Sequence, residues 1–250
     1  MRQRRALLWI LAVTAAAWRL FLAGSYFGWE ESDYGNLAMV RGVLEGGFAH
    51  YDMNHLPLYY AISAVVMAVL DDAVLSARLV SMVGGVATVV LGAGVADRLY
   101  GRRVAWTVGI LLVFQPELSL YSASSLREPL YAALLLGAFA SLTSERLVLA
   151  GALTGLAFLT RMDALLTFGP VLALHALGTA GRLRRLGAAL GPLLAVALAW
   201  SLYCGYEHGT YAFWEHSVAV NVETGGGLEE GALGAWLLGG LGVSWRLFTE

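Results

Sequence analysis

The sequence predicts an all-α, polytopic bundle of transmembrane helices, with interfacial helices in the first loop outside the membrane. Three observations predict it: the composition is apolar, the apolar stretches are long enough to cross a bilayer, and the arginines gather in alternate loops. Hydrophobic residues make up 58% and charged residues 14% of the chain, and its mean hydropathy is +0.67. Soluble domains carry roughly 45–50% apolar and 25% charged residues. We therefore expect lipid to be the main solvent.

The apolar stretches have the length of membrane crossings. A helix needs about 20 apolar residues to cross a hydrocarbon core of ~30 Å. The pattern predicts about seven to eight spans in a single transmembrane domain over residues 1–250. A weak apolar segment at 231–245 starts the eighth, and because the chain ends directly after it we expect a carboxy-terminal truncation. The seven clear spans are predicted at about 6–24, 73–96, 103–121, 128–143, 147–161, 164–179 and 186–204.

The arginines predict the topology. All 16 basic residues are arginine, and ten of them fall in alternate loops that share one side of the membrane. Only Asp97 and Glu145 of the 18 acidic residues share that side. By the positive-inside rule this side is cytoplasmic, so we expect a protein of the cytoplasmic (inner or plasma) membrane with a cytoplasmic N-terminus. The ten residues are Arg2, Arg4, Arg5, Arg98, Arg102, Arg103, Arg146, Arg182, Arg184 and Arg185.

The segment Leu56–Leu70 tests this topology, because counting it as a span would invert every later loop. It is short for a crossing, opens with Pro57 and two tyrosines, and is closed by Asp71 and Asp72. Tyrosines suit the headgroup region, so we interpret the segment as an interfacial helix. The first outer loop then runs over about 25–72, and a second short helix is predicted within it at Asn36–Gly47.

Three carboxylates follow the first span directly: Glu30, Glu31 and Asp33, with Tyr34 after them. Mutual repulsion makes clustered carboxylates more basic, and such a group is a competent general base for a hydroxyl nucleophile. The alternative is that these are solvated loop acids at the start of a helix that begins near Tyr34, with Asp33 as its N-cap. The sequence pattern alone leaves both interpretations open.

The order of motifs after this point resembles a known family. The acidic pair, Tyr34, a helix that contains alanine, Glu45-Gly46-Gly47 and then His55-x-Pro57-Leu58-Tyr59-Tyr60 are similar to the first extracytoplasmic loop of GT-C glycosyltransferases. This superfamily includes the protein O-mannosyltransferases and the lipid A aminoarabinose transferase. The resemblance extends over about residues 29–165. Its later motifs are Ala77-Arg78-Leu79, Asp97–Gly101, Pro116 with Tyr121-Ser122, Leu126–Leu130 and Gly155–Arg161.

The resemblance implies an enzyme that moves a sugar from a polyprenyl-phosphate donor to an acceptor hydroxyl on the extracytoplasmic side, with inversion. It implies a base among Glu30, Glu31 and Asp33, and contacts to acceptor or sugar from Tyr34, His55 and Glu128. Two residues depart from the family pattern: Glu30 stands where an aspartate is usual, and Leu56 replaces the first proline of the His-Pro-Pro motif. A misplacement on the order of 1 Å can cost ~100-fold in rate, so the identity of the base stays open.

Arg78, Arg127 and Arg161 are predicted at the outer ends of the second, fourth and fifth spans. A guanidinium binds phosphate bidentately, so these arginines are candidates for the donor phosphate. The alternative is local pairing, of Arg127 with Glu128 and of Arg161 with Asp163, or snorkelling to the headgroups.

Partners and cofactors follow from the same analysis. We expect a polyprenyl-phosphate-linked sugar, membrane lipid and an acceptor protein, lipid or glycan as partners, and no nucleic acid, because the net charge is only −2. The sequence requires no cofactor; His50, Asp52 and His55 leave a divalent metal ion open, although their spacing matches no fixed metal motif. The alternative function is a non-catalytic polytopic protein, transporter-like or an inactive fragment that acts as a scaffold. Transporters usually show paired repeats and broken helices at the midplane, and the sequence shows neither.

Overall fold

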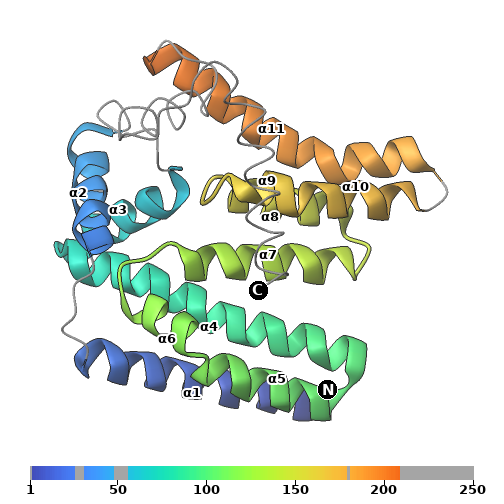
Figure 1. The fold of residues 1–250 in the computed structure, drawn as a ribbon, viewed down its shortest axis with the longest axis horizontal. Coiled ribbons are helices and arrows are strands. Elements are labelled where there is room, and N and C mark those ends of the chain that lie inside the picture. The colour runs from blue at the N-terminus through green and yellow to red at the C-terminus, as the bar shows by residue number, and fades with distance from the viewer. Residues whose placement is uncertain (1, 26–30, 48–55, 179–180, 209–250) are drawn as a thin grey trace, which may run out of the picture. The chain divides into compact units, whose positions relative to one another are not determined.

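The computed structural model describes residues 2–25, 31–47, 56–178 and 181–208. Within these ranges the chain forms helices and no strand (Figure 1). This confirms the predicted all-α membrane helix bundle. The chain divides into two units, Met1–Trp200 and Ser201–Glu250. The first unit holds all the contacts discussed below, and the described part of the second is the end of the last helix.

In the described ranges three helices are long and apolar enough to cross a membrane: α1 (Arg2–Ser25), α4 (Ala73–Tyr100) and α11 (Arg182–His208). Their apolar windows have mean hydropathies of 1.9, 2.1 and 1.7. A fourth candidate is the pair α5 (Arg102–Phe114) and α6 (Pro116–Ala123), whose axes differ by 53°. These helices match the predicted spans at 6–24, 73–96, 186–204 and 103–121, and they confirm that the chain contains transmembrane helices.

Two of the predicted spans contain an interruption that the sequence analysis did not predict. The span at 103–121 breaks at Gln115, whose backbone is extended with φ −60° and ψ 120°. Pro116 explains the break, because proline lacks an N–H and disfavours a helical conformation in the residue before it. The interruption in the span at 164–179 is milder: Phe168, between α9 (Asp163–Thr167) and α10 (Gly169–Leu177), keeps a helical conformation with φ −102° and ψ −23°. Pro170, in the first turn of α10, has no N–H with which to continue the hydrogen bonds of α9.

Between these breaks lie two short apolar helices, α7 (Glu128–Leu142) and α8 (Leu147–Phe158). Both are shorter than the ~20 residues of a full crossing. They match the predicted spans at 128–143 and 147–161 in position. How they cross the bilayer, with α9 and α10, stays a prediction.

The first loop contains two helices, as predicted: α2 (Glu31–Gly46) and α3 (Leu58–Leu70). One side of α3 is buried through Tyr59, Tyr60, Ser63 and Ala64, whereas Val69 is 81% exposed. Such one-sided burial is typical of a helix that packs on a bundle. The alternative interpretation of Asp33 as an N-cap is wrong, because α2 begins at Glu31 and Asp33 is its third residue.

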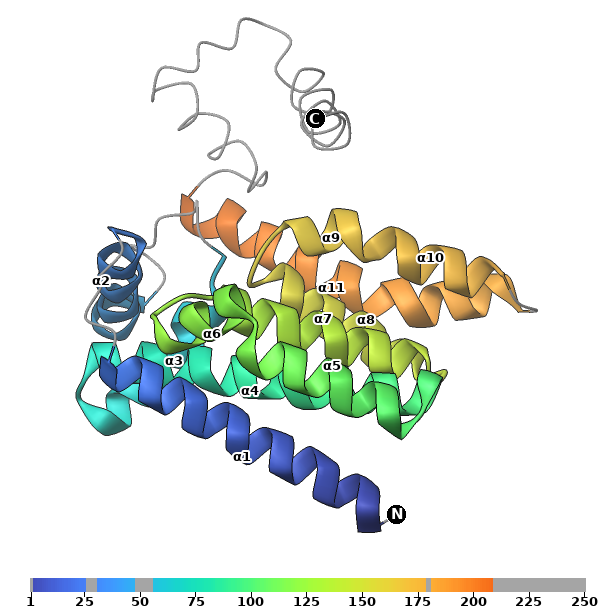
Figure 2. The same cartoon turned by 60° about the horizontal axis from the view of Figure 1, so that its bottom comes forward.

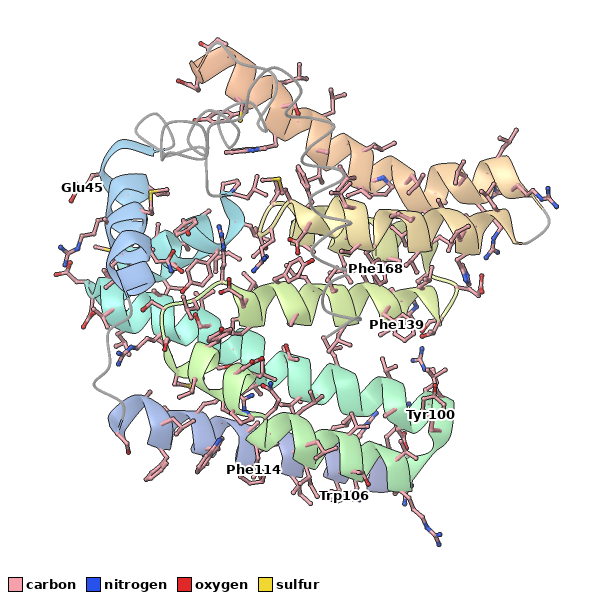
Figure 3. All side chains as sticks on the ribbon, in the orientation of Figure 1. Glu45, Tyr100, Trp106, Phe114, Phe139 and Phe168 are labelled. Carbon is pink, nitrogen blue, oxygen red and sulfur yellow. The ribbon has the colours of Figure 1, made fainter. Side chains whose placement is uncertain are left out.

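The helices α1, α4, α5, α7, α8 and α10 of the first unit run between two ends, whereas α2 lies across them at one end (Figures 1 and 2). Glu45 on α2 and Tyr100 at the end of α4 mark these opposite ends (Figure 3). We call them the α2 end and the Tyr100 end. The α2 end also holds the starts of α4 and α7 and the turn between α8 and α9 (Figure 1).

The Tyr100 end holds the arginine-rich loops, as the charge pattern predicts. There Arg4 Nε lies 2.9 Å from Asp97 Oδ2, which ties α1 to α4. Glu145, in the turn between α7 and α8, accepts a hydrogen bond from Arg185 on α11 and lies 3.3 Å from His175 Nε2 on α10. The two acids of this end are therefore used to join helices. Which side of the membrane the Tyr100 end faces stays a prediction.

Close packing holds α4 in the centre of the unit. Leu7 and Leu11 on α1 form one buried cluster with Val89 on α4 and Val113 on α5. On its other side α4 approaches α7 so closely that a Cβ on Gly84 would lie 2.6 Å from the backbone nitrogen of Leu130. Any larger side chain at Gly84 would push the two helices apart. The position of the α7 N-terminus on α4 is thus fixed by backbone contact.

Candidate active site

Two hydrogen bonds bring four helix ends together at the α2 end. The backbone N–H of Leu58, at the start of α3, donates to Leu159 O after α8 at 2.9 Å. Ser81 Oγ, in the third turn of α4, donates to Leu126 O before α7 at 2.6 Å. Both bonds join segments that are distant in the sequence. The residues around them, Arg78, Arg127, Glu128 and Arg161, therefore share one end of the bundle.

Arg161 is held by two carboxylates. Its Nη1 lies 3.1 Å from Glu128 Oε1 and its Nε 3.2 Å from Asp163 Oδ1, and its Cζ lies 5.6 Å from the centroid of the Tyr131 ring. The local pairing with Asp163 is present, whereas Glu128 pairs with Arg161 from across the bundle. The three groups together carry a formal charge of −1. Two of the five guanidinium N–H groups are used in these bonds, and the other three form no hydrogen bond to a described residue, so they can bind a ligand.

Glu128 has one unfilled acceptor. It lies in the first turn of α7, where the helix dipole favours a negative charge. Its Oε1 is bound to Arg161, whereas its Oε2 is buried and has no hydrogen-bond partner among the described residues. A buried carboxylate oxygen without a donor is costly. Glu128 is thus suited to accept a hydrogen bond from a hydroxyl group that enters the site.

Arg127 and Arg78 complete the set of arginines. Arg127 is the residue before α7, is partly buried, and forms no ion pair with any described residue. Arg78 is partly buried in the second turn of α4. The hydrogen bond from Ser81 to Leu126 connects the next turn of α4 with the residue before Arg127. The structure therefore brings Arg78 and Arg127 to the same place, close to Glu128.

The first-loop acids are partly outside the described residues. Glu30 and His55 are not described, and of Glu31, Asp33 and Tyr34 the structure gives the backbone only, in the first turn of α2. Their roles stay predictions. What the structure does fix is the position of α2 relative to the arginines, through a residue that the sequence analysis missed.

That residue is Asn36, which is only 7% exposed. Its Nδ2 donates to Ser125 O at 2.8 Å, and its Oδ1 accepts from the hydroxyl of Tyr60 at 2.7 Å. Ser125 is two residues before Arg127. Asn36 therefore ties α2 directly to the loop that carries the candidate phosphate ligands. The sequence predicted Asn36 only as the first residue of a short amphipathic helix, because a local pattern contains no information about a partner 89 residues away.

A comparison with protein families identifies the family of the chain. Residues 54–203 match the model of the dolichyl-phosphate-mannose-protein mannosyltransferase family. The chain belongs to this family. Family membership makes the protein a membrane glycosyltransferase of the GT-C type, as the resemblance predicts, and disfavours the transporter-like alternative. No curated protein and no solved structure matches the chain.

The family match covers α3 to α10 and most of α11. It therefore includes Arg78, Arg127, Glu128 and Arg161, and it begins after the acidic motif of Glu30, Glu31 and Asp33. In the mannosyltransferase family a lipid-linked sugar donor and a membrane setting are implied by the family description itself. The description also names a protein as the acceptor in that family, whereas the acceptor of this chain and the residues that act on it stay predictions.

No metal site is seen among the described residues. The part of the chain that the structure describes contains no group of three or more His, Cys, Asp or Glu side chains that could hold a metal ion. His50, Asp52 and His55 lie outside the described residues. A divalent ion at this loop therefore stays a prediction.

Proposed function

We propose that the chain transfers a sugar from a polyprenyl-phosphate donor to an acceptor hydroxyl at the α2 end, on the extracytoplasmic face of the membrane. The observation that carries this proposal is the hydrogen bond from Asn36 to Ser125. It links the helix that begins with the candidate base to the loop that ends in the candidate phosphate ligand. A direct displacement at an anomeric carbon needs a base and a phosphate ligand at the same end of the bundle, one on each side of the sugar.

The reaction balances with these groups alone. A carboxylate of Glu30, Glu31 or Asp33 takes the proton of the acceptor hydroxyl. The hydroxyl oxygen forms the new bond to the anomeric carbon, while the bond from that carbon to the phosphate oxygen breaks. The electron pair leaves with the lipid phosphate. Attack opposite the leaving group inverts the anomeric configuration.

Arg127 is the arginine best suited to the leaving phosphate. Arg161 shares its charge with Glu128 and Asp163, whereas Arg127 forms no ion pair with a described residue. An unpaired, partly buried guanidinium interacts more strongly with a dianion than one that is already neutralised. Arg78 is its neighbour on α4, and Arg161 with Glu128 is placed to contact the sugar hydroxyls. The three arginines thus divide the binding of donor between phosphate and sugar.

The test is a transfer assay with the full chain reconstituted in vesicles. We expect transfer of radiolabelled mannose from polyprenyl-phosphate mannose, since the family description names this sugar, and a product with the anomeric configuration opposite to that of the donor. A nucleotide-linked mannose, offered at the same concentration, is the control donor and should give no product. Equal transfer from the nucleotide sugar, or retention of configuration, contradicts the proposal.

A further inference from the structure

The two halves of the proposed site are joined by a small buried polar network. It contains Asn36 on α2, Tyr59 and Tyr60 on α3, Ser81 on α4 and the backbone of Ser125 and Leu126 before α7. Tyr59, Tyr60 and Ser81 are fully buried. Buried polar groups are costly unless they are hydrogen-bonded. A network of this kind therefore has a defined geometry, and it lies where the acidic helix meets the arginine loop.

The side-chain amide of Asn36 forms one hydrogen bond through its nitrogen and another through its oxygen. Ser125 O can only accept, so it faces the amide nitrogen, and the hydroxyl of Tyr60 donates to the amide oxygen. A single orientation of the side chain satisfies both bonds. We call this pair of bonds the Asn36 bridge. It fixes the rotation and the height of α2 one turn after Asp33.

Tyr59, the neighbour of Tyr60 on α3, forms the next part of the network. The hydroxyl of Tyr59 donates to Ala77 O at 3.0 Å, directly before Arg78, and lies 2.9 Å from Ser81 Oγ. Ser81 in turn holds Leu126 O, directly before Arg127. The rings of Tyr59 and Tyr60 pack edge to face with centroids 5.4 Å apart. Two adjacent tyrosines thus connect the helix of the acids with both candidate phosphate ligands.

We propose that Asn36 is a positioning residue, which sets the distance between the first-loop carboxylates and Arg127 through the Asn36 bridge. The inference rests on the proposed function, because it assigns the base to the start of α2 and the phosphate to Arg127. In a direct displacement the base side and the phosphate side must be aligned across the sugar. A displacement of about 1 Å is enough to cost ~100-fold in rate.

The first variant, Asn36→Ala, removes both bonds of the bridge. We expect kcat to fall by about 100-fold, while KM for the donor changes by less than about 3-fold, because Arg127 and Glu128 are untouched. Asn36→Gln is the more revealing variant. It keeps the donor and the acceptor but lengthens the side chain by one methylene, so a positioning role predicts that kcat falls here as well.

Two controls separate position from stability. Thr88 on α4 is buried and donates to Gly84 O and Pro129 O, so Thr88→Val removes a buried bond between helices away from α2. We expect it to keep kcat within about 3-fold of wild type. A distance measurement between spin labels on Leu44→Cys and Leu75→Cys, in a Cys204→Ser background, gives a readout without activity. With the wild-type Asn36, the distances between the two labels should form a narrow distribution. In Asn36→Ala and Asn36→Gln this distribution should broaden or shift.

The outcomes are distinct. If Arg127→Gln lowers transfer but Asn36→Ala and Asn36→Gln retain kcat, the bridge does not position the site and this inference is wrong, although the proposed function stands. An equal loss in Thr88→Val, or an unchanged distance distribution, also overturns it, since the effect is then one of stability. If Arg127→Gln retains full activity, and so do the first-loop variants Glu30→Gln, Glu31→Gln and Asp33→Asn, the proposed function itself is wrong.

Discussion

Replacing the base of the first loop by its amide should lower sugar transfer by about 10²–10⁴-fold, the usual contribution of a positioned general base. The three substitutions to compare are Glu30→Gln, Glu31→Gln and Asp33→Asn. Each keeps the size of the side chain and removes its ability to take a proton. We expect one of them to show the full loss in kcat with a small change in KM for the donor, and that one identifies the base.

The chain offers a matched control for this series. Glu45 is an exposed acid in the last turn of α2, on the same helix as Glu31 and Asp33. Glu45→Gln makes the same chemical change at the far end of the helix and should leave kcat unchanged. Wild-type transfer in all three first-loop variants would show that the base lies elsewhere, and Glu128 would become the next carboxylate to test.

The second large effect is expected at Arg127. Loss of a single preorganised charge that stabilises a leaving group typically costs about 10²–10³-fold, so Arg127→Gln should lower kcat/KM for the donor by at least ~100-fold. Arg127→Lys keeps the charge but loses the bidentate geometry, and we expect an intermediate loss of about 10-fold. The measurement is transfer from polyprenyl-phosphate mannose over a range of donor concentrations.

Arg103 supplies the control for this second prediction. It is an exposed arginine in the first turn of α5, at the Tyr100 end. Arg103→Gln changes the net charge by the same amount and should retain kcat/KM. If Arg127→Gln behaves like this control while Arg161→Gln abolishes transfer, the phosphate is bound by Arg161, in spite of its two carboxylate partners.

Much of the fold is predictable because hydropathy and charge are local signals. The long helices α1, α4 and α11 begin and end within a few residues of the predicted spans. The helix at Leu58–Leu70 matches the predicted surface helix, and the arginine-rich loops do share one end. Pro116 and Pro170 lie at the interruptions after Gln115 and Phe168, and neither proline was interpreted as a break. The spans were predicted from hydropathy, which stays high across both prolines. A proline changes the mean hydropathy little, although it removes a backbone hydrogen bond.

The site was less predictable, because it depends on pairings between distant residues. The family motifs identify Arg78, Arg127, Glu128 and Arg161, and the structure brings them to one end. The pairing of Glu128 with Arg161 and the contacts of Asn36 with Ser125 and Tyr60 join residues 33, 89 and 24 positions apart. A hydrophobic period or a turn signal contains no information about such pairs. Only the packing of α2, α3 and α7 on α4, and of α8 on α7, reveals them.

The central claim is that the start of α2 faces the extracytoplasmic side while the arginine-rich Tyr100 end faces the cytoplasm. Thiol labelling with a membrane-impermeant maleimide in sealed, right-side-out vesicles tests it most directly, with Ser32→Cys and Arg103→Cys each in a Cys204→Ser background. The account predicts that the cysteine at position 32 is labelled in intact vesicles and the one at 103 only after permeabilisation. The reverse pattern would contradict the account.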